Sequence, residues 1–231
     1  RPAPPGHLLD ALAGVDGLRW IRLHYAYPAG FPLDILPVMR RHAKICNYLD
    51  IPLQHISDNV LRAMRRGLTR DRTEALLKRI RDEMPGIALR TTMLVGHPGE
   101  TEADFETLMD FVAETKFERL GVFTYSHEEG THAHQLPDDV PEDVKAQRRD
   151  DLMALQQDIS FALNRERIGQ TYQTVIDRLE GGYYVGRTEY DSPEVDNEVL
   201  VAATRPLAVG EYYAVRITDA LEFDLFGEVV V

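Results

Sequence analysis

The chain has 231 residues, of which 44% are hydrophobic and 28% are charged, and it contains one cysteine. A single cysteine excludes an internal disulfide and any metal site built from cysteine alone, which needs three or four thiolates. The net charge of −12 disfavours general nucleic-acid binding, because phosphate contacts need Lys and Arg, and the lack of a long apolar run or a signal-peptide pattern predicts a soluble, cytoplasmic protein with no membrane segment.

Strands and helices are predicted to alternate through the first half of the chain. The apolar runs at 20–27, 48–53, 88–95 and 120–125 are typical of strands, and helical spacing of apolar residues follows at 35–43, 59–66, 70–84 and from 101 onward. Ser57 is a predicted N-cap, and Thr101 with Asp104 resembles a capping box. Four such units in a row indicate a parallel sheet, and four strands are too few to close a barrel.

The composition changes after a long helix that is predicted to begin at 140 and to end near Gly169. Short strands separated by turn signals are predicted at 172–179, 183–189, 199–203, 212–217 and 226–230. Five short strands in so small a region favour an OB-like barrel. Residues 168–231 carry four basic and twelve acidic residues, so the net charge is −8 here and −4 in the remainder of the chain.

Five segments in order along the chain carry a resemblance to a known family. They are LDIPLQH at 49–55, MRRG at 64–67, VGHPGET at 95–101, YSHEEGT at 125–131 and DSPEVD at 191–196. Together they resemble the radical-SAM methylthiotransferases, and the tail resembles a TRAM domain. Gln54 with His55, and the runs at 126–131 and 191–196, favour the branch that modifies an aspartate on protein twelve of the small ribosomal subunit.

The resemblance implies a fold and a set of cofactors. The fold is a partial (βα) barrel of radical-SAM type, with the last four βα units at 1–139, a connecting helix at 140–167 and a TRAM domain at 168–231. The family uses S-adenosylmethionine and two 4Fe-4S clusters, each held by three cysteines. This chain has only Cys46, which we expect in the core. We therefore predict that the chain ligates neither cluster, contains no catalytic residue and is not competent for the reaction alone.

Five residues are predicted to bind the cofactor. The family places Gln54 near S-adenosylmethionine, although a loop residue capping the next helix is an alternative. Arg90 and Thr92 lie two apart on one face of a strand, where Arg90 suits the methionyl carboxylate or, equally, a neighbouring structural carboxylate. Gly96 and Glu100 belong to a strand-end motif that passes close to adenine, although a plain turn needs the same glycines.

Two further groups of residues suggest a function, but each also has a purely structural interpretation. His127, His132 and His134 cluster in sequence, but their spacing is not that of a metal site, and we expect a solvated loop and no metal ligands. A basic stretch could touch RNA, yet a solvated helix face paired with Asp71, Glu74 and Asp82 is favoured. This basic stretch consists of Arg62, Arg65, Arg66, Arg70, Arg72, Lys78, Arg79 and Arg81.

Charge also indicates the partner. Ribosomal proteins of the small subunit are typically basic, so an acidic TRAM domain favours such a protein as the substrate. RNA contact is possible but not favoured. The alternatives are the tRNA-modifying branch of the family, which needs RNA affinity, and a non-catalytic remnant that binds the ribosome.

Overall fold

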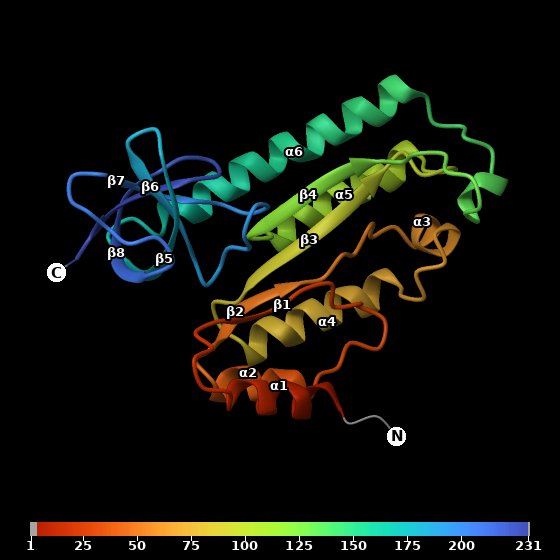
Figure 1. Cartoon of the computed structure of the whole chain (residues 1–231). Coiled ribbons are helices and arrows are strands. Elements are labelled where there is room, and N and C mark those ends of the chain that lie inside the picture. The colour runs from red at the N-terminus through yellow and green to blue at the C-terminus, as the bar shows by residue number, and fades with distance from the viewer. Residues whose placement is uncertain (1–3, 231) are drawn as a thin grey trace.

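A computed structural model describes residues 4–230 of the chain as a four-stranded parallel sheet and a closed five-stranded barrel, linked by one long helix (Figure 1). The predicted outer ends of the domains, residues 1–3 and 231, lie outside the described residues. The expected order of a partial (βα) barrel followed by a small all-β barrel is confirmed.

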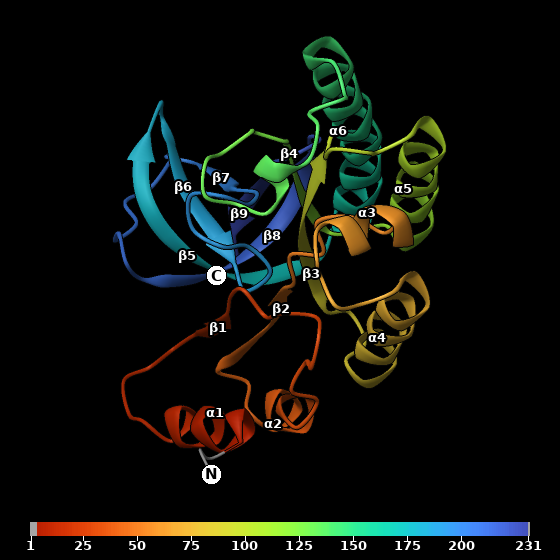
Figure 2. The same cartoon turned by 90° about the vertical axis from the view of Figure 1, so that its right-hand side faces the viewer.

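The sheet has the order β1-β2-β3-β4, and its strands are β1 (Ile21–Leu23), β2 (Ile45–Asp50), β3 (Ala88–Val95) and β4 (Arg119–Thr124). Every neighbouring pair is parallel. The connecting helices are α2 (Ile35–Arg41), α3 (Asp58–Ala63), α4 (Arg70–Glu83) and α5 (Glu102–Thr115). Figure 2 shows the helices gathered on one side of the strands, which leaves the other face of the sheet free of helices.

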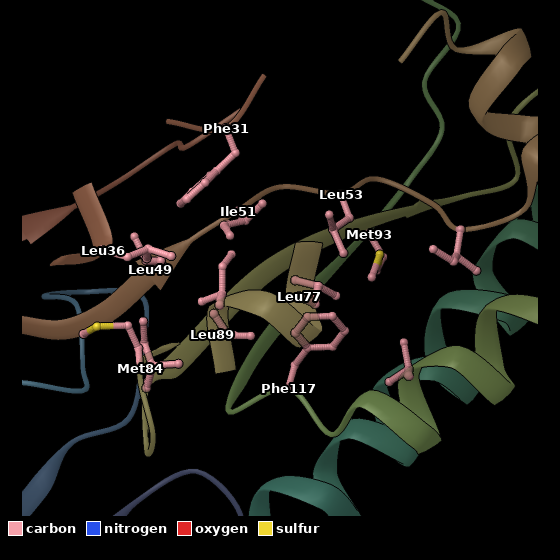
Figure 3. Close-up of a cluster of buried hydrophobic side chains, with 14 of the residues drawn as sticks. Phe31, Leu36, Leu49, Ile51, Leu53, Leu77, Met84, Leu89, Met93 and Phe117 are labelled. Atoms are coloured by element: carbon pink, nitrogen blue, oxygen red, sulfur yellow. The ribbon is translucent and has the colours of Figure 1, made fainter. Parts of the chain in front are cut away.

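The core lies between the sheet and these helices. Alternate residues of β3 are buried there, namely Leu89, Thr91, Met93 and Val95. The three apolar ones belong to one cluster with Leu77 of α4 and Phe111 of α5. Figure 3 shows part of this cluster around Leu49, Leu89 and Met93. Burial of this apolar surface stabilises the sheet and fixes which face of each strand points away from the helices.

The barrel consists of β5 (Thr171–Glu180), β6 (Tyr183–Thr188), β7 (Val199–Ala202), β8 (Tyr212–Ala220) and β9 (Leu225–Val229), in the order β5-β6-β7-β9-β8. All pairs are antiparallel except the parallel pair of β7 and β9. Closure removes the open strand edges that would otherwise pair with other chains. Ile176, Val215, Ile217 and Leu225 fill its interior.

The long helix α6 (Glu142–Arg165) packs against β4 and α5 and reaches β8 of the barrel (Figure 1). Within the described part of the chain, no helix is both long and apolar enough to cross a membrane.

Local sequence signals predicted most elements but not all their ends. The prediction for 88–95 matches β3, and Thr101 with Asp104 forms the expected capping box on α5. The strand predicted at 48–53 is wrong by three residues, since β2 runs from Ile45 to Asp50 and contains Cys46. Ser57 does precede α3, but its side chain makes no capping bond because it donates to Asp104. The helix α1 (Pro5–Ala13) and the short helix η1 (Ala133–Gln135) were not predicted.

Candidate functional site

A cleft of about 480 Å³ lies where β2, β3 and β4 end. Parallel α/β sheets bind their ligands at this carboxyl edge. The chain after β2 contributes Gln54, the end of β3 contributes Leu94 and His97, and the chain after β4 contributes Tyr125. The remaining lining residues are Ala63, Met64, Arg66, Thr124, Ser126, Glu128, Thr131, His132 and Ala133. We name this space the strand-end cleft.

Gln54 is held in the strand-end cleft by the backbone of β3. Its N–H donates to the carbonyl of Thr92 at 2.9 Å, and its own carbonyl accepts from the N–H of Leu94 at 2.7 Å. The residue also has a φ of +72°, a left-handed backbone that a glutamine adopts only when its surroundings impose it. The backbone of Gln54 is therefore fixed at the wall of the cleft, and the residue lines the cleft.

The predicted residues of β3 share a face but not a site. Arg90, Thr92 and Leu94 all point away from the helices, and only Leu94 lines the strand-end cleft. Arg90 lies at the opposite end of the strand, with Asp50 at 3.1 Å and Asp196 of the barrel at 3.3 Å. Arg90 thus already has two carboxylate partners, which is the structural alternative that the sequence left open.

The turn after β3 is built around Gly96 and Glu100. Gly96 has a φ of +76°, and a Cβ there would lie 2.2 Å from Cγ of Lys145 on α6. Glu100 has a buried side chain that accepts from the N–H of Gly96 at 2.9 Å and from Arg148 at 2.9 Å. Glu100 does not line the cleft. Its buried carboxylate instead positions the backbone of the turn by accepting the N–H of Gly96.

Burial is the largest cause of the pKa shifts of two groups packed against this turn, His55 and Glu100. Nε2 of His55 lies 3.6 Å from Glu100 without a hydrogen bond, and the N–H of Ser57 donates to His55 Nδ1 at 3.0 Å. Desolvation lowers the pKa of His55 to about 4. Burial raises the pKa of Glu100, against the opposing effects of the Gly96 N–H and Arg148. His55 is therefore neutral at pH 7.

The other end of the sheet is closed by residues 188–197 of the barrel, which we name the floor loop. Asp191 forms a buried ion pair with Arg119 of β4, and its second oxygen accepts from the Thr188 hydroxyl at 2.5 Å. Asp196 accepts from the Tyr48 hydroxyl of β2 at 2.7 Å. The DSPEVD segment thus lies against the helix-free face of the sheet, at the amino ends of its strands.

Cys46 does not fit the ligand set of an iron–sulfur cluster. It lies in β2 with no exposed surface, packed against Tyr48 and Ala88. Burial raises the pKa of its thiol to about 11, whereas a cluster binds thiolates. Among residues 4–230, no group of three His, Cys, Asp or Glu residues has a metal-binding arrangement.

The basic stretch divides into paired and unpaired residues. On α4, Arg70 pairs with Glu74 at 2.7 Å and Lys78 pairs with Asp82 at 2.7 Å, as expected from their spacing. Asp71, however, forms no ion pair within the described residues. Arg62, Arg65 and Arg72 instead line a second cleft with residues of the turn between α3 and α4.

Sequence reasoning missed several residues of the site. Leu94 follows Thr92 at strand spacing and could have been found from the same alternation. Met64 and Arg66 come from the turn after α3, and no local sequence signal indicates that this turn reaches the strand ends. The floor loop carried a recognisable motif without any sign of where it binds.

Comparisons with known proteins find a match for the sheet-containing part of the chain and another for the barrel. Residues 4–112 match the Radical SAM superfamily model, and residues 168–230 match the TRAM domain model. The chain is also 58% identical to a protein of Flavobacterium psychrophilum named Ribosomal protein uS12 methylthiotransferase RimO, over 96% of this chain and 52% of that protein. A protein of the same name from Cytophaga hutchinsonii is 56% identical over 96% of this chain and 51% of that protein.

The chain spans about half the length of the curated relatives it matches. Among solved structures, coproporphyrinogen III oxidase (HemN) from Escherichia coli, described as a radical SAM enzyme, is 24% identical with a TM-score of 0.48. That likeness covers 68% of this chain and 36% of HemN and is too distant to support an argument.

Proposed function

We propose that this chain is part of a radical SAM methylthiotransferase, and that the complete protein attaches a methylthio group to an aspartate of ribosomal protein uS12. The observation that carries the proposal is the 58% identity across 96% of the chain, which includes both the sheet and the barrel. The strand-end cleft supports it, because it lies at the edge where parallel sheets bind ligands.

We propose that the strand-end cleft holds S-adenosylmethionine. The Gln54 amide can pair with polar groups of the cofactor, and Leu94 with Tyr125 offers apolar surface for adenine. The turn at Gly96 presents backbone close to the cleft, and Glu100 holds that turn in place. Thr92 lies one strand position deeper than Leu94, on the same face.

Arg90 has a more demanding place in this proposal. To bind the methionyl carboxylate it would exchange Asp50 or Asp196 for the cofactor. Arg90 is charged, and its guanidinium is already bound by these two buried carboxylates. It is therefore the predicted cofactor residue that the geometry supports least. In the family, the cofactor and its cluster supply the radical chemistry, and the buried Cys46 supplies no ligand set for a cluster. We therefore propose that this chain alone does not catalyse the reaction.

We propose that the acidic barrel recognises the substrate. We take the unit to be residues 168–231, joined through a helix at 140–167 to the radical-SAM part at 1–139. With a net charge of −8, this unit attracts a basic ribosomal protein and repels tRNA. A ribosomal protein is made and assembled in the cytoplasm, which is where we place this protein.

The experiment that tests the substrate is a binding titration of the labelled chain with purified uS12 and, separately, with bulk tRNA. We expect uS12 to bind tightly, with an affinity that weakens as salt rises, and tRNA to bind at least about tenfold more weakly. Preference for tRNA would favour the tRNA-modifying branch instead. Binding of neither partner would contradict the assignment of recognition to this portion.

A further inference from the structure

An arginine-lined cleft of about 380 Å³ lies beside the strand-end cleft, on the other side of the turn between α3 and α4. We propose that this arginine cleft binds the phosphodiester backbone of RNA. The inference rests on the proposed function for the identity of the RNA, which would be ribosomal RNA next to the protein substrate. The residues that carry it are Arg62, Arg65 and Arg72.

These three arginines are set apart by what they lack. Other basic side chains of α4 each bind a carboxylate, for example Lys78 with Asp82 and Arg79 with Glu83. Throughout residues 4–230, by contrast, Arg62, Arg65 and Arg72 have no carboxylate within ion-pair distance, and all three are exposed. Three guanidinium groups around one concavity leave a local excess of positive charge on a protein of net charge −12.

The other lining groups are compatible with an anion. Leu61, Gly67 and Leu68 are uncharged, and Thr69 precedes the amino end of α4, where the helix dipole adds positive potential. Asp58 is the one carboxylate in the lining, and its Oδ1 already accepts the backbone N–H of Arg70 at 2.7 Å. The positive charge of the arginine cleft is therefore only partly offset.

The chemistry of the side chains selects phosphate. A guanidinium is planar and presents paired N–H donors that match two phosphate oxygens. Several arginines along one concave surface suit successive phosphates of a strand, and contacts of this kind position a nucleic acid without reading its sequence. An acidic peptide would offer carboxylates to the same donors, and it is the competing outcome of the test below.

The arginine cleft lies next to the strand-end cleft, because residues of one turn line the two clefts alternately. Met64 and Arg66 line the strand-end cleft, whereas Arg65 and Gly67, which alternate with them along the chain, line the arginine cleft. Arg66 turns inward, donating to the carbonyl of Pro52 at 2.6 Å. A strand of RNA held by Arg65 would thus lie beside the mouth of the strand-end cleft, where it could orient an RNA-associated protein substrate.

The test is fluorescence anisotropy of a labelled single-stranded RNA of about 16 nucleotides, titrated with the chain between about 50 and 200 mM KCl. The cleft variant is R62Q/R65Q/R72Q. The matched control is K78Q/R79Q/R149Q, which removes the same charge from residues that already have carboxylate partners. Circular dichroism checks that both variants fold.

We expect the cleft variant to bind the RNA about tenfold more weakly or worse, whereas the affinity of the control should change by less than about threefold. The slope of log K against log salt should become shallower in the cleft variant, by the amount that about two phosphate contacts contribute. Equal losses in the two variants, or an unchanged cleft variant, would overturn the inference. Displacement of the RNA by poly-glutamate at equal charge concentration would assign the cleft to acidic peptides instead.

Failure of this inference can be told from failure of the proposed function. Binding of uS12 alone, measured on the same variants, depends on the acidic barrel and is expected to stay unchanged. Loss of RNA binding with retained uS12 binding supports the arginine cleft. Retained RNA binding in the cleft variant overturns it, whatever the uS12 result.

Discussion

The two ends of the four-stranded sheet are finished in opposite ways. At the amino ends of the strands, the floor loop meets Arg119 and Tyr48 with buried ion pairs and hydrogen bonds. At the carboxyl ends, Gln54 and Gly96 adopt left-handed backbone conformations around an open cleft. The difference teaches that one sheet separates its tasks. At the first end, buried charges of the sheet are paired with the floor loop, whereas at the second end the side-chain amide of Gln54 forms no hydrogen bond within residues 4–230 and lines an open cleft.

Breaking the closed end gives the largest expected effect. The substitution Asp191→Asn removes the charge that pairs with the buried Arg119, and we expect a loss of about 3–5 kcal/mol in the free energy of unfolding. Urea denaturation measures it. The control is Glu228→Gln, which disrupts the exposed pair with Arg216 and should change stability by less than about 1 kcal/mol. If the two variants lost the same free energy of unfolding, the ion pair between the floor loop and the sheet would stabilise the fold no more than an exposed ion pair does.

The substitution Gly96→Ala probes the framework of the open end. The new Cβ would meet Cγ of Lys145, and the residue would keep a positive φ, so we expect a loss of about 3 kcal/mol. The matched control is Gly99→Ala, where φ is +80° but no atom lies within 4 Å, and a loss of about 1 kcal/mol is expected. If both variants unfold at the same denaturant concentration, packing of α6 on the turn does not matter.

Acid should weaken the same end through His55. Its pKa is about 4 in the folded protein and about 6.5 when unfolded, so the unfolded chain binds more protons between these values. Stability should therefore fall by about 2–3 kcal/mol as pH drops from 6.5 to 4. The groups that face the ring are Glu100, Asp104, His97 and Arg148.

The measurement is the pH dependence of urea denaturation for the wild type and for His55→Asn. Burial raises the pKa of Asp104, but the hydrogen bonds from Ser57, Thr101 and Asn59 outweigh it and lower the pKa to about 2. Its own contribution to stability is therefore lost only below about pH 4. The difference between the two proteins between pH 6.5 and 4 isolates His55. Parallel pH profiles would show that its ring protonates freely in the folded state.

The smallest expected effect is on ligand binding. Gln54→Gly should weaken S-adenosylmethionine binding by about tenfold, which is the loss of one good hydrogen bond. Stability should be unchanged or slightly higher, because glycine relieves the positive φ. Ligand-detected NMR of the chain with S-adenosylmethionine reads the affinity, and Gln54→Asn keeps the amide as a control. Unchanged binding in the glycine variant would remove Gln54 from the cofactor site.

Local chemistry decided much of the fold. The apolar run at Ala88–Val95 predicted β3 residue for residue, and the Thr101–Asp104 capping box marked the start of α5. The short strands after α6 followed from their turn signals. These features depend on residues that are near in sequence, where propensity, capping and periodicity act directly.

The sequence by itself determined the kinds of element, their order and the residues at the strand ends. Only the tertiary structure decided that the floor loop covers the amino end of the sheet, that Arg90 faces Asp196, and that Lys145 requires a glycine at position 96. The partner of a buried charge depends on how two distant segments pack, and Arg119 and Asp191 are 72 residues apart. Spacing along the chain carries no information on such a contact, because its energy arises only after the two segments have been brought together.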